Sequence, residues 1–144
     1  METLNPILVV DDDAGIRELI SDTLGDEGYV VISASDGVAA LLMLEEWQPS
    51  LILLDLLMPL MDGDEFLRRY RELPGEHVPV VVFSASGRNR IGRTAAQAEA
   101  DAFLAKPFDL DDLLGLVTRF APMVASNGLT AGGGLTAGSG LTAA

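Results

Sequence analysis

The chain has 144 residues, 49% of them hydrophobic, so it is long and apolar enough to fold as a domain with a buried core. Its 9 Lys and Arg residues against 22 Asp and Glu give a net charge of -13, which repels phosphate backbones and argues against direct nucleic-acid binding. The absence of Cys excludes disulfides and thiolate metal sites, and no apolar run approaches the roughly 20 residues of a membrane span, so we expect a cytoplasmic protein without membrane contact.

The first part of the chain alternates short apolar runs with segments of helical periodicity. Residues 7–10 and 29–34 are β-branched runs that predict strands. Between them, apolar residues recur at helical spacing over residues 14–26, which predicts a helix. A second helix is expected after Asp36, whose side chain can cap it, and it ends before Pro49.

The middle of the chain repeats this order. Residues 51–54 are continuously apolar and stop at Asp55, as expected for a strand buried on both faces of a parallel sheet. A helix capped by Asp64 and terminated by Pro74 follows, and residues 78–83 predict a fourth strand.

The last part of the folded region contains three further elements. The Ala-rich residues 91–99 predict a weakly amphipathic helix, residues 102–105 a short strand, and residues 110–120 a final amphipathic helix opened by Asp109. Five strands therefore alternate with five helices. This alternation predicts an α/β fold with a doubly wound parallel sheet, because parallel neighbours need crossover connections.

The composition changes near the C-terminus. A Leu-Thr-Ala sequence recurs with a period of six and is separated by glycines. Glycine at this density does not offset the entropy of ordering, and three imperfect repeats are too few to stack as a β-helix. We therefore expect a folded domain over residues 1–122 and a flexible tail over residues 123–144.

Polar side chains follow the predicted strands at their carboxyl ends, where open α/β sheets bind ligands. They are Asp11, Asp12, Asp55, Ser84 and Lys106. Converging carboxylates repel one another unless a divalent cation lies between them, and an all-oxygen set favours Mg²⁺. A lysine and a hydroxyl opposite the metal suit phosphoryl transfer. The next acid, Asp13, can instead cap the following helix.

Residues 4–121 resemble the receiver domain of two-component response regulators. The matching motifs, in order, are Val9-Val10-Asp11-Asp12, Asp55 with Met58-Pro59 and Asp62-Gly63, Ser84-Ala85, and Lys106-Pro107-Phe108. The resemblance implies a flavodoxin-like sheet of order 2-1-3-4-5 with five helices. It also implies a phosphoacceptor switch like the single-domain chemotaxis regulators, with a receiver excised from a longer protein as the alternative.

The resemblance assigns the acids to phosphorylation and metal binding. It implies that Asp55 receives a phosphoryl group from a sensor histidine kinase or a histidine phosphotransfer protein. Asp12 would bind Mg²⁺ directly and Asp11 largely through water, while Asp55 and the backbone carbonyl of Leu57 complete the protein ligands. The chain would then catalyse only its own phosphorylation and dephosphorylation, and would not be an enzyme acting on other substrates.

The remaining motif positions imply a conformational switch. Lys106 would pair with the phosphoryl group, Ser84 would hydrogen-bond to it, and Phe103 would move inward with Ser84. The Lys106–Pro107 bond is expected to be cis. The altered surface would be the fourth helix, fifth strand and fifth helix, read by a downstream protein, with the chain a monomer or a weak phosphorylation-dependent dimer.

One position departs from the family pattern, and two others bear on the rate of dephosphorylation. Glu99 stands where glycine is common after the fourth helix, which puts the output surface in question. Leu57 and Ser86 occupy the two positions that tune dephosphorylation in the family. Because an apolar residue at the first position disfavours a hydrolytic water, we expect a long-lived phosphoryl group.

Two other functions compete with a phosphoacceptor switch. A haloacid-dehalogenase-type phosphohydrolase also uses an aspartyl nucleophile, and Asp11 with Asp13 forms the Asp-x-Asp pattern, but Gly15 stands where such enzymes have Thr or Val. A pseudo-receiver that only binds partners is the other alternative. The sequence argues against a pseudo-receiver, because the five polar residues at the strand ends are all present: Asp11, Asp12, Asp55, Ser84 and Lys106.

Overall fold

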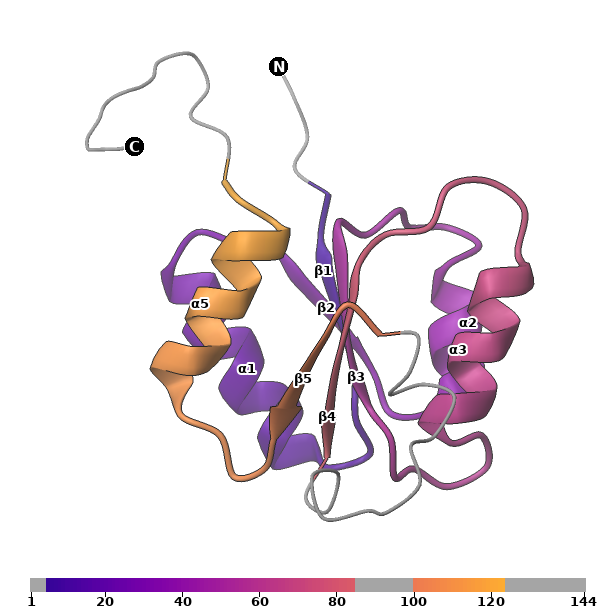
Figure 1. The fold of residues 1–144 in the computed structure, drawn as a ribbon, viewed down its shortest axis with the longest axis horizontal. Coiled ribbons are helices and arrows are strands. Elements are labelled where there is room, and N and C mark those ends of the chain that lie inside the picture. Colours follow the sequence, from indigo (N-terminus) through magenta and orange to yellow (C-terminus); the bar gives the residue numbers. More distant parts are fainter. Residues whose placement is uncertain (1–4, 85–99, 124–144) are drawn as a thin grey trace.

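The structure, a computed structural model, describes residues 5–84 and 100–123, with only the backbone of Ser84. The helix predicted over residues 91–99 and nearly all of the predicted tail lie outside the described residues. Figure 1 shows the described part as one sheet with helices on both faces. In these residues, no helix is long and apolar enough to cross a bilayer.

Five parallel strands form one sheet in the order β2-β1-β3-β4-β5, which confirms the expected topology. The strands are β1 (Ile7–Val10), β2 (Val31–Ala34), β3 (Leu51–Asp55), β4 (Val80–Ser84) and β5 (Ala102–Ala105). The pairing places Val10 beside both Ala34 and Leu54, so the ends of β1, β2 and β3 are level. All five carboxyl ends therefore meet at one edge of the sheet.

In the part of the chain that the structure describes, two helices cover each face of the sheet, as can be followed in Figure 1. They are α1 (Ala14–Asp26) and α5 (Leu110–Phe120) on one face, and α2 (Gly37–Met43) and α3 (Gly63–Glu72) on the other. Alternate residues of β1, β3 and β4 point to opposite layers, and both layers are buried, so these strands are apolar throughout. The core thus consists of two clusters with the sheet between them.

The helix starts agree with the sequence except in one case. Asp13, Asp36 and Asp109 cap α1, α2 and α5, as predicted. The expectation that Asp64 caps the third helix was wrong, because the Asp62 side chain accepts a hydrogen bond from Glu65 N at 2.9 Å. The β3–α3 loop starts the helix two residues earlier than its sequence pattern indicated.

Two strands are shorter at their start than predicted. The second begins at Val31, since the N–H of Tyr29 bonds to the carbonyl of Leu24 in α1 at 3.0 Å and not to a neighbouring strand. The fourth runs Val80–Ser84, since the N–H of Val78 bonds to the hydroxyl of Tyr70 at 2.7 Å and not to a neighbouring strand. Before each of these strands, a backbone N–H therefore bonds to a helix residue and not to the sheet.

Candidate functional site

The predicted acids and the lysine lie together at the carboxyl edge of the sheet. Asp11 and Asp12 directly follow β1, Asp55 is the last residue of β3, and Lys106 follows β5. One carboxylate oxygen from each of the three acids lies within 4.8 Å of the others. Lys106 Nζ is 2.9 Å from Asp11 Oδ2 and 3.6 Å from Asp55 Oδ2. The predicted clustering of these residues is confirmed.

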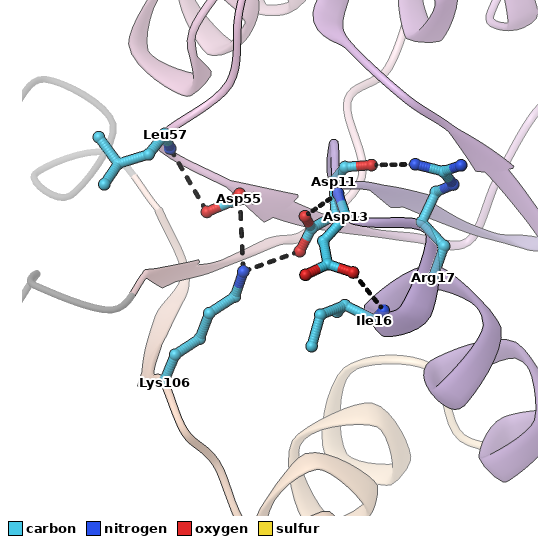
Figure 2. A network of polar contacts seen from close by, with 7 residues as sticks. All are labelled: Asp11, Asp13, Ile16, Arg17, Asp55, Leu57 and Lys106. Carbon is cyan, nitrogen blue, oxygen red and sulfur yellow. Dashed lines mark hydrogen bonds and ion pairs between the residues drawn. The ribbon is translucent and has the colours of Figure 1, made fainter.

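Asp11 is fully buried and is held from four directions. Its N–H donates to the carbonyl of Ala34 at 3.1 Å, and its Oδ1 accepts from Asp13 N at 2.9 Å. Its Oδ2 accepts from Lys106, and its backbone carbonyl accepts from Arg17 Nη1 at 2.7 Å (Figure 2). These bonds satisfy a buried carboxylate that would otherwise be strongly destabilising.

Asp55 is almost as buried, with 3% of its surface exposed. Its Oδ1 accepts a hydrogen bond from Leu57 N at 3.3 Å. Burial first, and then the charge of Asp11, raise its pKa to about 6, while Lys106 and the Leu57 N–H oppose this rise. In the absence of a second cation, the Asp55 carboxylate is therefore electrostatically unfavourable at neutral pH.

Lys106 reaches the two buried acids from the loop after β5. Its peptide bond to Pro107 is cis, as the resemblance implied. Its Nζ lies 5.1 Å from the centroid of the Phe83 ring, and this ring packs edge-on against Phe108. The Lys106 ammonium group therefore lies near an aromatic ring as well as near the two carboxylates. A cation–π contact with this ring stabilises the positive charge where water is largely excluded.

The β3–α3 loop holds Asp55 in place from its C-terminal side. Gly63 N donates to the carbonyl of Leu56 at 3.0 Å. A Cβ on Gly63 would lie 2.8 Å from the backbone oxygen of Asp55 and from Leu56, so only glycine fits against this strand end. In the same loop, Leu60 has a φ of 69° with 87% of its surface exposed.

The other predicted site residues are only partly described. Ser84 pairs with Ala105 at the end of β4, which puts its backbone at the same edge; its side chain lies outside the described residues, as does Ser86. Phe103 is half-buried and packs against the core layer under α2 and α3. The Leu57 side chain is 54% exposed beside the carboxylates. None of these placements tests the predicted switch.

Arg17 is a contact that the sequence reasoning missed. A signal was present: a basic residue near the start of α1 opposes the helix dipole, so it needs a local partner. The partner is the backbone carbonyl of Asp11. The role of Leu57 N as a donor to Asp55 was also missed, since only the Leu57 carbonyl had been considered.

The donors present fit a hard divalent cation. Three carboxylates converge, and among the described residues Lys106 is the cation that forms ion pairs with them, which leaves the group of four with a net charge of about -2 when all are ionised. All the converging ligand atoms are oxygens. Such a site suits Mg²⁺ better than zinc or copper, which prefer nitrogen and sulfur ligands.

Comparison with known proteins is consistent with this geometry. The family profile described as "Response regulator receiver domain" matches residues 7–118. Sporulation initiation phosphotransferase F of Bacillus subtilis (strain 168) is 35% identical over 117 residues, which cover 81% of this chain and 94% of that protein. Response regulator MprA of Mycobacterium ulcerans (strain Agy99) is 42% identical over 110 residues, or 75% of this chain, which spans about half, 46%, of that protein.

Solved structures give the same result. The response regulator TrrA of Thermotoga maritima, in complex with Mg(2+)-BeF, superposes with a TM-score of 0.71 at 31% identity, covering 81% of this chain and 99% of that one. The match covers most of both chains, so the similarity is global and not confined to the acidic site. A phosphohydrolase or a pseudo-receiver is not favoured by these matches.

Proposed function

This chain belongs to the response regulator receiver family and is a phosphoacceptor signalling domain, and we propose that Asp55 is its phosphoacceptor and Mg²⁺ its cofactor. The observation that carries the proposal is the position of Asp55. It is a buried carboxylate at the end of β3, close to Asp11 and 3.6 Å from Lys106 Nζ, with its pKa raised to about 6. A nucleophile at this place faces the open edge of the sheet, from which a donor can approach.

The proposed reaction is transfer of a phosphoryl group from a phosphohistidine. A carboxylate oxygen of Asp55 attacks phosphorus, the phosphorus–nitrogen bond breaks, and the electron pair returns to the imidazole of the donor. The product on this chain is an aspartyl phosphate. Because Lys106 Nζ is 3.6 Å from Asp55 Oδ2, it can pair with a phosphoryl oxygen after a small movement away from Asp11.

The metal ligands we propose are Asp11, Asp12, Asp55 and the backbone carbonyl of Leu57. Bound Mg²⁺ would supply positive charge that offsets both the carboxylates and the incoming phosphoryl oxygens. The chain itself contributes the preorganised acids, with Asp11 and Asp55 buried and Asp12 exposed toward solvent. Water therefore has access to the open side of the cluster, as Mg²⁺ requires.

The proposed output is a change of surface. Ser84 would bond to the phosphoryl group and Phe103 would turn inward, changing the face formed by the fourth helix, β5 and α5. The half-buried position of Phe103 leaves it room to become more buried. We propose a histidine kinase or histidine phosphotransfer protein as donor and a protein as downstream target. The exposed Leu57 would slow hydrolysis of the aspartyl phosphate. The chain would catalyse only its own phosphorylation and dephosphorylation.

Phosphorylation by a small donor tests the proposal. Incubation with Mg²⁺ and acetyl phosphate should give one phosphoryl adduct by intact mass, which Asp55→Asn abolishes. The matched control is Asp22→Asn on α1, an exposed acid that should leave the adduct unchanged. An adduct on Asp11 with steady turnover would favour a phosphohydrolase, and a wild-type chain without any adduct would favour a pseudo-receiver.

Metal binding can be tested without phosphorylation. Because Mg²⁺ should bind only the folded chain, a concentration of about 100 times its dissociation constant should stabilise the fold by roughly 2.7 kcal/mol. Urea unfolding with Mg²⁺ and with EDTA measures this difference. Equal stability in both would contradict the metal site.

A further inference from the structure

Arg17 occupies an unusual place for a cation. It lies near the start of α1, where the helix dipole disfavours positive charge, and beside a cluster of acids that we propose to bind another cation. Its guanidinium Nη1 donates to the backbone carbonyl of Asp11 at 2.7 Å, across the turn from β1 into α1 (Figure 2). The contact is short and joins a charged donor to the carbonyl of a fully buried residue.

This hydrogen bond acts on the peptide unit between Asp11 and Asp12. A peptide is planar, so fixing the direction of the Asp11 carbonyl also fixes the N–H of Asp12 and the position of its Cα. The Asp11 side chain has its own anchors, Asp13 N and Lys106 Nζ, both at 2.9 Å. Loss of Arg17 would leave those two bonds in place.

Asp12 has no such anchors. Its carboxylate is exposed, and within residues 5–84 and 100–123 it makes no hydrogen bond or ion pair. Its direction toward Asp11 and Asp55 therefore depends on the backbone from which it projects. The peptide that Arg17 holds is the preceding one, which makes Arg17 the side chain best placed to aim Asp12.

We propose that Arg17 is a positioning residue for the metal site, aiming the Asp12 carboxylate through the Asp11 carbonyl. The proposal rests on the function proposed above, because it needs Mg²⁺ to bind at this cluster. For the effect of removing Arg17 on Mg²⁺ affinity, this role predicts the opposite sign to the one expected from charge alone. Removal of a positive charge near the acids should tighten cation binding, whereas loss of the positioning contact should weaken it.

The test is calorimetric titration of the full chain with Mg²⁺ alone. Arg17→Met and Arg17→Gln remove the charge and cannot make the same charged contact, while Arg17→Lys keeps the charge and one donor group. We expect the two neutral variants to bind Mg²⁺ about 10-fold more weakly, the scale reported for partners that orient metal ligands, and Arg17→Lys to recover part of the loss. Two neutral variants are included so that the comparison stands if one of them does not fold.

The control is Glu18→Gln, a charge change at the next, exposed residue of α1, which should alter the affinity by less than about 2-fold because exposed charges are screened. Melting temperatures in EDTA separate general stability from metal affinity. A folded neutral variant that binds Mg²⁺ as tightly as wild type, or more tightly, would overturn the role of Arg17. A wild-type chain that binds no Mg²⁺ would overturn the metal site itself, and this inference with it.

Discussion

Asp55→Asn should stabilise the metal-free protein at neutral pH. The Asp55 pKa is about 6 in the folded chain against an ordinary value of 3.8, because burial and Asp11 disfavour its ionised form. Relative to the ionised carboxylate, protonated Asp55 stabilises the folded chain. This contribution to the free energy of unfolding is fully present below pH 3.8 and is lost as the pH rises through about 6. At pH 7.5 the ionised carboxylate therefore lowers the free energy of unfolding by about 3 kcal/mol.

Asparagine retains an oxygen that can accept from Leu57 N but carries no charge. Lys106 still has Asp11 at 2.9 Å, so its charge remains paired. In EDTA, Asp55→Asn should be more stable than wild type by up to about 3 kcal/mol at pH 7.5 and by about half that at pH 5, where Asp55 is mostly protonated in the folded wild type but mostly ionised in the unfolded chain. Urea unfolding followed by circular dichroism at both pH values measures this difference.

The pH dependence of the stability difference is the decisive result. Asp22→Asn, an exposed acid on α1, serves as the control and should show almost no difference at either pH. If Asp55→Asn is no more stable than wild type at pH 7.5, or if its advantage is the same at pH 5, the reasoning from burial and charge is refuted.

Three further substitutions test the surroundings of the site by urea unfolding in EDTA. Lys106→Met should destabilise the protein by about 3 kcal/mol at pH 7.5, because it leaves two buried carboxylates without a cation, and Mg²⁺ should restore part of the loss; an unchanged midpoint would contradict the pairing. Leu60→Gly should stabilise by roughly 0.5 to 1 kcal/mol, since a left-handed backbone is unfavourable for leucine and the side chain is mostly exposed. Gly63→Ala should destabilise by about 2 kcal/mol, because its Cβ would meet the Asp55 backbone; a neutral effect would show that the loop relaxes easily.

Local patterns were sufficient to predict the order of the elements that the structure describes. Strands buried on both faces are continuously apolar, so Ile7–Val10 and Leu51–Asp55 were recognisable, and their parallel pairing brought Asp11 and Asp55 to one edge. Helix starts were predictable where the acid directly before the apolar periodicity is the cap, as at Asp13, Asp36 and Asp109. Between β3 and α3 two acids compete, and the bond from Gly63 N to Leu56 O, which joins residues of the loop, selected Asp62 over Asp64.

The sequence by itself determined the fold class and the set of chemical groups at the sheet edge, because periodicity and strand ends are local properties. Only the tertiary structure decided how those groups interact. It brings Lys106, distant in sequence, closer to Asp11 than to Asp55, and it buries Asp55 enough to raise its pKa. It also directs Arg17 to the Asp11 carbonyl. Burial and distance depend on how separate segments pack, so no local pattern encodes them.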